Sequence, residues 1–379
     1  MSSVPAAADV DRLWIGLPSP ISDRVGAGGH PCQGLWWAPR DSSPRVAVIA
    51  THYNVDFSEH YLAPFLAARG LGFLGWNTRF RGDEIHFLLD QALVEIGVGV
   101  RWLRDHAGVD HVVLLGNSGG GSLMAAYQSE AVEPVVRPAP GMRLAAGLDQ
   151  LVAGDAFIAL AAHSGRPEVL TAWMDPSVVD ETDPITAAPD LDLWNPHNGP
   201  PYTQEFVTRY RQAQRDRNNR ITAWAQDQLT RLEGTPAGDR LFTVPRVWAD
   251  PRMVDPTLEP TQREPNSCYA GDPHWANYSV WGIGTCCTLR SWLSMWSLET
   301  SQCQAAPHLA KVTVPSLVIN ADADTGVFPS DAEAIAGALA SPDKTVMSMA
   351  GEHYFRQPAG ARDAVADRIA AWIAERFPV

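Results

Sequence analysis

The sequence is poor in positive charge and has no long apolar run. Its 379 residues include 29 Lys and Arg against 43 Asp and Glu, which gives a formal net charge of −14. Nucleic acids and anionic membrane surfaces attract basic patches, so this balance argues against both as partners. No apolar run approaches the roughly 18 residues of a membrane-spanning helix, and residues 1–9 lack the pattern of a signal peptide. We therefore expect a cytoplasmic protein.

Cysteine is also scarce. An odd count in a long chain without an export pattern indicates free, buried thiols. A disulfide between Cys268 and Cys303 stays open as the alternative. No C-x-x-C motif or nearby His pair accompanies the adjacent cysteines, so we expect no metal site. The five cysteines are Cys32, Cys268, Cys286, Cys287 and Cys303.

Nucleotide-binding signatures are missing as well. No Lys-Ser or Lys-Thr pair follows Gly121, as a P-loop would require, and residues 116–121 do not spell G-x-G-x-x-G. We therefore expect neither a phosphate-binding loop nor a dinucleotide, and no cofactor of another kind.

What the chain does contain is an apolar run of strand length that ends at a glycine and is followed by a serine within G-x-S-x-G. Residues 111–118 read His-Val-Val-Leu-Leu-Gly-Asn-Ser, three glycines follow, and a helical pattern begins directly behind them. G-x-S-x-G in this setting predicts a nucleophile elbow, a strained turn that exposes the Ser118 hydroxyl above a sheet. Gly116 and Gly120 lie where the chain doubles back, where a side chain would clash. A purely structural glycine-rich loop is the alternative.

The pattern of apolar segments predicts an α/β fold. Strands alternate with amphipathic helices on both sides of the elbow, which favours a parallel sheet covered on both faces. The first two strands are expected to be antiparallel additions at its start. The predicted strands are 11–15, 33–38, 45–50, 72–77, 111–116, 156–162, 314–320 and 345–350, and the predicted helices are 57–69, 83–106, 122–131, 330–339 and 360–375.

The alternation of predicted strands and helices stops between residues 163 and 312. The segment holds a charged helical stretch over 203–232 and eight of the fourteen tryptophans, Trp173, Trp194, Trp224, Trp248, Trp275, Trp281, Trp292 and Trp296. It leaves the carboxyl end of a strand, where ligands bind in such sheets, so we interpret it as a cap over the site. A structural extension that never meets substrate is the alternative. The domain prediction is a core of residues 1–162 and 313–379 with a mainly helical cap of residues 163–312.

A serine hydroxyl needs a base within hydrogen-bond reach and a carboxylate that orients the base. His353 is the preferred base because it follows the last predicted strand, although His52 and His163 also follow strands. Two carboxylates, Asp322 and Asp324, follow the strand before it and qualify as the acid.

An oxyanion hole needs backbone N–H groups aimed at the developing negative charge. Gly119 directly follows the serine and stands at the start of a helix, so its N–H is the first expected donor. The second should come from the loop after residues 45–50, at Tyr53 or Asn54.

The order Ser118, Asp324, His353 resembles the α/β-hydrolase superfamily. The resemblance covers about residues 30–162 and 313–379 and implies an eight-stranded, mostly parallel sheet with a Ser-Asp-His triad. Residues 314–324 are similar to the strand and loop that carry the acid of that family, in which the later aspartate is the triad member. The resemblance therefore implies Asp324 rather than Asp322, and residues 350–353 resemble the family's histidine loop.

Two departures from the family pattern concern the loops. Many members have His-Gly after the third strand, whereas Tyr53 follows His52 here, which leaves the second oxyanion donor open. The family's Asp-x-Arg-Gly motif is represented by residues 77–82, Asn-Thr-Arg-Phe-Arg-Gly. We interpret Arg81 as structural and Arg79 as a substrate contact. The other expected substrate contacts are His52, His163 and Trp281.

The sequence thus predicts a serine hydrolase that cleaves a carboxylic ester or lactone of an apolar or aromatic small molecule through an acyl-enzyme. The same triad also fits a thioesterase, an amidase, a carbon–carbon bond hydrolase or an acyltransferase. A non-catalytic ligand-binding protein on the same fold is the alternative of a different class. Whether the chain forms a homo-oligomer is left open.

Overall fold

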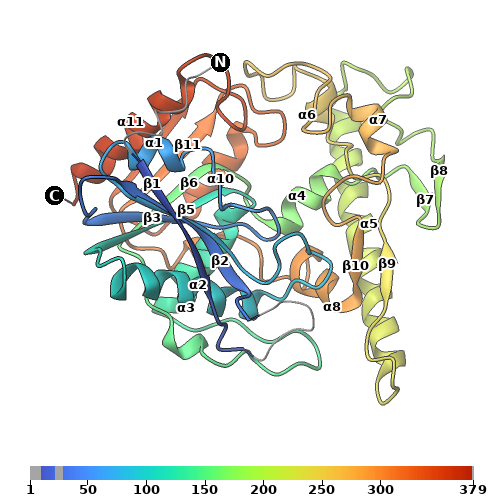
Figure 1. The fold of residues 1–379 in the computed structure, drawn as a ribbon. Coiled ribbons are helices and arrows are strands. Elements are labelled where there is room, and N and C mark those ends of the chain that lie inside the picture. The colour runs from blue at the N-terminus through green and yellow to red at the C-terminus, as the bar shows by residue number, and fades with distance from the viewer. Residues whose placement is uncertain (1–9, 22–28, 378–379) are drawn as a thin grey trace.

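The computed structural model describes residues 10–21 and 29–377. An eight-stranded mixed sheet forms its centre, in the order β1-β2-β4-β3-β5-β6-β11-β12 (Figure 1). The first two strands are antiparallel to their neighbours and all other pairs are parallel, as the sequence predicts. The strands are β1 Val10–Leu17, β2 Cys32–Pro39, β3 Val46–Ala50, β4 Gly72–Asn77, β5 His111–Ser118, β6 Ala156–Ala162, β11 Ser316–Ala321 and β12 Lys344–Met349.

Helices cover both faces of this sheet. Ala47 and Ile49 of β3 pack toward the face covered by α2 (Leu89–Asp105), α3 (Gly120–Val132) and α10 (Pro329–Ala338). Val46 and Val48 pack toward the other face, against α1 (Ala63–Ala67) and α11 (Ala361–Ala374). Successive residues of a strand point to opposite faces, so a strand buried on both faces must be apolar throughout. This accounts for the continuous apolar runs of the central strands and confirms the α/β class.

Two predicted helices are shorter than expected. Asp56, with Glu59 three residues later, has the sequence pattern of a cap for helix 57–69. In the structure only α1 forms, and the Asp56 carboxylate instead accepts from the Ser58 N–H and the Asn77 side chain, both at 2.9 Å. Helix 83–106 begins only at Leu89. Residues before Leu89 form turns, and among them Glu84 makes contacts with distant loops that are described below.

The segment between β6 and β11 is a large insertion that lies beside the sheet (Figure 1). Its longest element is α5, Gln204–Leu232, at the position predicted for a charged helix, and much of the remainder is irregular. The other elements are α4 Arg166–Trp173, β7 Val178–Asp180, β8 Asp183–Ala187, β9 Leu241–Thr243, α6 Pro251–Val254, α7 Pro273–Asn277, β10 Cys286–Thr288, α8 Leu289–Ser291, the π-helical turn Trp292–Trp296, η2, and α9 Ala306–Leu309. A short 3-10 turn, η1 Leu148–Gln150, precedes β6.

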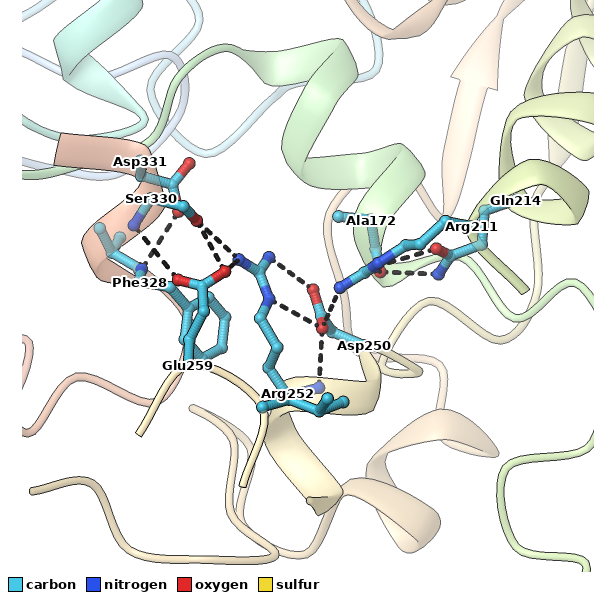
Figure 2. Close-up of polar contacts among 12 residues, drawn as sticks. Ala172, Arg211, Gln214, Asp250, Arg252, Glu259, Phe328, Ser330 and Asp331 are labelled. Carbon is cyan, nitrogen blue, oxygen red and sulfur yellow. Dashed lines mark hydrogen bonds and ion pairs between the residues drawn. The ribbon is translucent and has the colours of Figure 1, made fainter. Parts of the chain in front are cut away.

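A chain of ion pairs ties the insertion to the core (Figure 2). Asp250 accepts from Arg211 of α5 at 2.6 Å and from Arg252 at 2.8 Å. Arg252 also donates to Glu259 at 2.9 Å and to the Ser330 hydroxyl, in the first turn of α10, at 3.1 Å. These pairs hold the insertion against the helix that follows the loop carrying Asp324.

All five cysteines are free thiols, so the alternative of a Cys268–Cys303 disulfide is wrong. Four are buried, and Cys286 is half-buried. Among residues 10–21 and 29–377, no helix is both long and apolar enough to cross a bilayer, and no group of three His, Cys, Asp or Glu side chains could hold a metal ion. Residues 1–9, which bear on the predicted absence of a signal peptide, lie outside the described part of the chain.

Candidate active site

The backbone at Ser118 has the geometry of a strained elbow. Ser118 ends β5 with φ of +56°, a region that residues with a side chain seldom adopt. A Cβ on Gly116 would lie 2.5 Å from the Cα of Gly121, and one on Gly120 would lie 2.4 Å from the carbonyl oxygen of Thr51. Gly116 is therefore required where the chain doubles back, as the sequence suggested, whereas Gly120 is required by the close approach of the segment after β3.

The side chain of Asn117 stabilises this turn through two polar contacts. Its side-chain Nδ2 donates to the Leu160 carbonyl of β6 at 2.8 Å, and its Oδ1 lies 3.1 Å from Nε2 of the buried His60. Both contacts are buried. The strained serine is thus held by the neighbouring strand and by the loop that precedes α1.

Asp324 and His353 form a buried pair at the carboxyl edge of the same sheet. Oδ2 of Asp324 lies 2.6 Å from Nδ1 of His353, and the two residues are 2% and 4% exposed. Oδ1 of Asp324 accepts from the backbone N–H groups of Gly326 at 2.9 Å and Val327 at 3.0 Å. Burial alone would raise the pKa of Asp324, but the His353 imidazole and these hydrogen bonds outweigh it and hold that pKa below its usual value. Asp324 is therefore ionised and in position to orient the imidazole.

The second candidate acid, Asp322, has a different contact. Its Oδ1 accepts from the Gly351 N–H at 3.1 Å, and its own N–H donates to the Met349 carbonyl at 3.0 Å. Asp322 thus joins the acid-bearing loop to the loop that carries His353. Of the two carboxylates, the structure brings only Asp324 to the imidazole.

Comparison with solved structures gives likenesses in fold over almost the whole chain. A structure of DcsB in complex with its substrate analogue is 13% identical, covers 97% of this chain and 100% of its own, and superposes with a TM-score of 0.53. A monoacylglycerol lipase from Paleococcus ferrophilus is 13% identical over 96% of this chain and 99% of its own, with a TM-score of 0.44. A dienelactone hydrolase from Anabaena variabilis is 12% identical over 97% and 98%, with a TM-score of 0.43. The chain has the α/β-hydrolase fold.

Comparison at the level of sequence gives no match, either to a protein-family model or to a curated protein. At 13% identity the likeness to DcsB concerns the fold alone. In this fold the nucleophile, the acid and the histidine follow one another along the chain, as Ser118, Asp324 and His353 do. Ser118 Oγ makes no hydrogen bond within the described residues, so its contact with His353 belongs to the mechanism proposed below.

One residue of the insertion reaches the Asp324–His353 pair. The hydroxyl of Tyr269 donates to Oδ1 of Asp324 at 2.7 Å and lies 2.9 Å from Nδ1 of His353. The rings of Tyr269 and His353 are 4.5 Å apart, and Trp173 and Trp248 pack against the tyrosine ring from the insertion side. Sequence reasoning missed Tyr269, which lies in an irregular segment without periodicity.

The backbone amides near the elbow differ in their contacts. Gly119 precedes α3, and the first amides of a helix have no partner within it. Within the described residues the N–H of Tyr53 makes no hydrogen bond, whereas that of Asn54 donates to Nδ1 of His52 at 3.4 Å. The Tyr53 side chain is fixed in the core by its hydroxyl, 2.9 Å from that of Ser122. Of the two loop donors predicted, Tyr53 is the one with a free amide.

Two of the predicted substrate contacts, His52 and His163, lie at the elbow. Nε2 of His52 packs against Gly119, where a Cβ would lie 2.8 Å away. The N–H of His163 donates to the Ser118 carbonyl at 3.2 Å, and its buried Nδ1 has no partner among the described residues. Burial lowers the pKa of His163 to about 3, and it lowers that of His52 well below the usual value, so both imidazoles are neutral.

The other two predicted contacts lie elsewhere. Arg79 is buried in an ion pair with Glu95, whose carboxylate accepts from the arginine Nε at 2.6 Å and from its backbone N–H at 2.7 Å. It is therefore a structural residue and not the substrate contact we predicted. Trp281 is 76% exposed on the insertion, where its carbonyl accepts from Nε1 of Trp248, so its indole is not brought to the elbow.

A buried ion pair that the sequence did not reveal lies at the elbow instead. Arg166, four residues beyond the end of β6, contacts Glu84 at 3.4 Å. An arginine within four residues of the carboxyl end of a central strand was the available signal, because ligands bind at that edge of such sheets.

Proposed function

We propose that the protein is a serine hydrolase that cleaves a carboxylic ester through an acyl-enzyme. The observation that carries the proposal is the buried Asp324–His353 contact of 2.6 Å at the sheet edge where Ser118 stands with a φ of +56°. A serine becomes a nucleophile when an imidazole oriented by an ionised carboxylate can reach its hydroxyl, and Ser118, Asp324 and His353 all lie at this edge of the sheet. The α/β-hydrolase fold also supports the proposal of an ester-cleaving serine hydrolase.

In the proposed reaction, Ser118 Oγ attacks the ester carbonyl while Nε2 of His353 takes its proton. Asp324 accepts the Nδ1 proton in a hydrogen bond and stabilises the imidazolium that forms. The negative charge on the carbonyl oxygen is stabilised by the N–H groups of Gly119 and Tyr53. His353 then returns the proton to the departing alcohol. A water molecule, activated by the same imidazole, releases the acid and restores Ser118.

The experiment is turnover of a panel of p-nitrophenyl esters, lactones, thioesters and amides by the wild-type protein and by Ser118→Ala. We expect esters to be the best substrates and the substitution to lower kcat by roughly 10⁵–10⁶, the scale seen when a nucleophile is removed. A loss below tenfold would place the chemistry elsewhere. Preferred cleavage of a thioester or an amide would keep the triad and change the substrate class.

A further inference from the structure

Arg166 is an arginine whose guanidinium is buried at the elbow between two aromatic rings. The residue is 2% exposed, and its guanidinium carbon lies 5.0 Å from the ring centroid of Tyr53 and 4.5 Å from that of Trp296. Aromatic faces on a guanidinium hold its plane and leave the N–H groups on its edge for hydrogen bonds. The site therefore contains a fixed positive group whose donors lie in one plane.

Two side-chain donors converge on the residue that follows Ser118. A Cβ on Gly119 would lie 2.8 Å from Nη1 of Arg166 and 2.8 Å from Nε2 of His52. Only glycine at this position leaves room for both groups. The glycine at position 119 is thus required by these two side chains, and not only by the strain of the turn.

The hydrogen bonds of His52 make its Nε2 a donor. Its Nδ1 accepts from the N–H groups of Asn54 at 3.4 Å and Val55 at 3.3 Å. Burial, and after it the positive charge of Arg166, lowers the pKa of His52 far below its usual value, so the ring is neutral and carries one proton. A neutral imidazole that accepts at Nδ1 must carry that proton at Nε2. This proton faces Gly119.

Glu84 accepts only one of the hydrogen bonds that the Arg166 guanidinium can donate. Its Oε2 lies 3.4 Å from Nη2 of the arginine and also accepts from the side chain of Asn54 at 3.0 Å, while its Oε1 accepts from the Gly284 N–H at 2.8 Å. Within the described residues, Nε and Nη1 of Arg166 make no hydrogen bond, and Nε is fully buried. A buried guanidinium with unused donors is costly unless a ligand completes it.

A second buried arginine, Arg217, shows a guanidinium whose three nitrogens all donate hydrogen bonds. Arg217 donates five hydrogen bonds, two of them to Glu181 at 2.8 and 2.6 Å and three to backbone carbonyls. Arg217 holds the insertion together and needs no further acceptor. Arg166, in contrast, has donors without an acceptor, and one of them lies against Gly119.

We propose that the substrate is an ester whose acyl part carries a carboxylate, and that Nη1 of Arg166 and Nε2–H of His52 bind this carboxylate. The donors lie against the residue next to the nucleophile, so only a few atoms separate the carboxylate from the scissile carbonyl. The half-ester of a short dicarboxylic acid, such as succinate, has this form. The proposal deepens the proposed function and rests on it, because it assumes attack by Ser118.

The test compares monomethyl succinate, which carries a carboxylate, with dimethyl succinate, which does not. We expect the wild-type protein to prefer the half-ester in kcat/KM by more than about tenfold, since a charge-assisted hydrogen bond contributes about 1.5–3 kcal/mol. In Arg166→Met the preference should disappear, and in Arg166→Lys it should be retained in part. Arg231→Met, at the exposed end of α5, is the control for the loss of one positive charge and should leave the preference unchanged.

Arg166→Met leaves Glu84 buried without a cation, so the double variant Glu84→Gln/Arg166→Met accompanies it and removes both charges together. Circular dichroism checks the fold of each variant. Equilibrium binding of monomethyl succinate to the Ser118→Ala protein, with and without the double substitution, gives a readout that does not need turnover. Loss of this binding in the double variant supports the proposal.

Failure of this proposal can be told from failure of the proposed function. Equal hydrolysis of the two succinate esters, with Ser118 still labelled by a fluorophosphonate, would overturn the carboxylate site and leave the hydrolase standing. Unchanged binding of monomethyl succinate in the double variant would overturn it as well. Absence of both hydrolysis and labelling would overturn the two together.

Discussion

The hydroxyl of Tyr269 donates a hydrogen bond of 2.7 Å to the carboxylate of Asp324. Tyr269 belongs to the insertion, whereas Asp324 belongs to the core loop after β11, so the two parts of the chain meet at the group that orients His353. Gly326 makes this contact possible, because a Cβ there would lie 2.6–2.8 Å from the tyrosine ring. The insertion therefore contacts the Asp324–His353 pair directly, whether or not it touches substrate.

We expect Tyr269→Phe to lower kcat about tenfold with little change in KM. The substitution removes one hydrogen bond to a charged group, for which about 1.5–3 kcal/mol is typical, and leaves the ring packing intact. Steady-state kinetics with a p-nitrophenyl ester measures both constants. Tyr278→Phe, on the surface of the insertion, is the matched control and should behave like the wild type. An unchanged kcat in Tyr269→Phe would show that the contact does not position Asp324.

The two neighbouring aspartates should differ sharply. Asp324→Asn should lower kcat by roughly 10⁴, because an amide in place of the carboxylate no longer holds the imidazole in the reactive tautomer. Asp322→Asn should stay within a few-fold of wild type, since its amide oxygen can still accept from the Gly351 N–H. Kinetics and melting temperatures of both variants check this, and the reverse order would exchange their roles.

The tight elbow should tolerate no side chain at Gly116. In Gly116→Ala the new Cβ would meet the backbone of Gly121 at 2.5 Å, and neither segment is free to move, so we expect a loss of about 3 kcal/mol in the free energy of unfolding. Gly337→Ala in α10 is the control, because nothing lies within 4 Å of its Cβ, and it should stabilise the protein by about 0.5–1 kcal/mol. Urea denaturation measures both, and equal stability of the two variants would contradict the model of the turn.

Glu168 should make the protein less stable as the pH rises. Burial raises the pKa of its carboxyl from 4.5 to about 7, and its Oε2 has no partner among the described residues. Between pH 4.5 and 7 the unfolded chain has lost this proton while the folded chain keeps it, so the unfolded state binds fewer protons and folding stability falls with pH. Glu168→Gln removes this loss.

From pH 5 to pH 8, Glu168→Gln should therefore gain about 2–3 kcal/mol in the free energy of unfolding relative to wild type, since the pKa of Glu168 rises from 4.5 to about 7 on folding. Urea denaturation at the two pH values measures the difference. Glu299→Gln, at an exposed position, controls for the loss of one negative charge. If the difference between Glu168→Gln and wild type is the same at both pH values, Glu168 does not titrate in this range.

Much of the core could be predicted because it follows local rules. Strands buried on both faces are apolar without interruption, as in residues 46–50, and G-x-S-x-G between a strand and a helix indicates a single kind of turn. The carboxyl ends of parallel strands meet at one edge, which places Asp322, Asp324 and His353 there, and the family resemblance then indicated Asp324 as the acid. The hydrogen bond between Asp324 and His353 agrees with that expectation.

The rest depends on contacts between segments that are distant in sequence. Asp56 has the local pattern of a helix cap, yet its carboxylate binds the Asn77 side chain of β4 instead. Tyr269 lies 55 residues from Asp324 in a segment without periodicity, so no pattern points to their contact. Arg79 looked like a substrate contact because it follows a strand, but the buried Glu95 lies on α2 beneath it and neutralises it. None of these partners can be read from neighbouring residues.

The most direct test of the account is the site of covalent labelling by a fluorophosphonate. This reagent reacts with a serine hydroxyl only when a base activates it, so it reports on the relation between Ser118 and His353 and needs no knowledge of the natural substrate. We predict a single adduct, located on Ser118 by mass spectrometry of the digested protein, which is lost in Ser118→Ala and strongly slowed in Asp324→Asn. Absence of an adduct, or an adduct on a residue other than Ser118, would contradict the assignment.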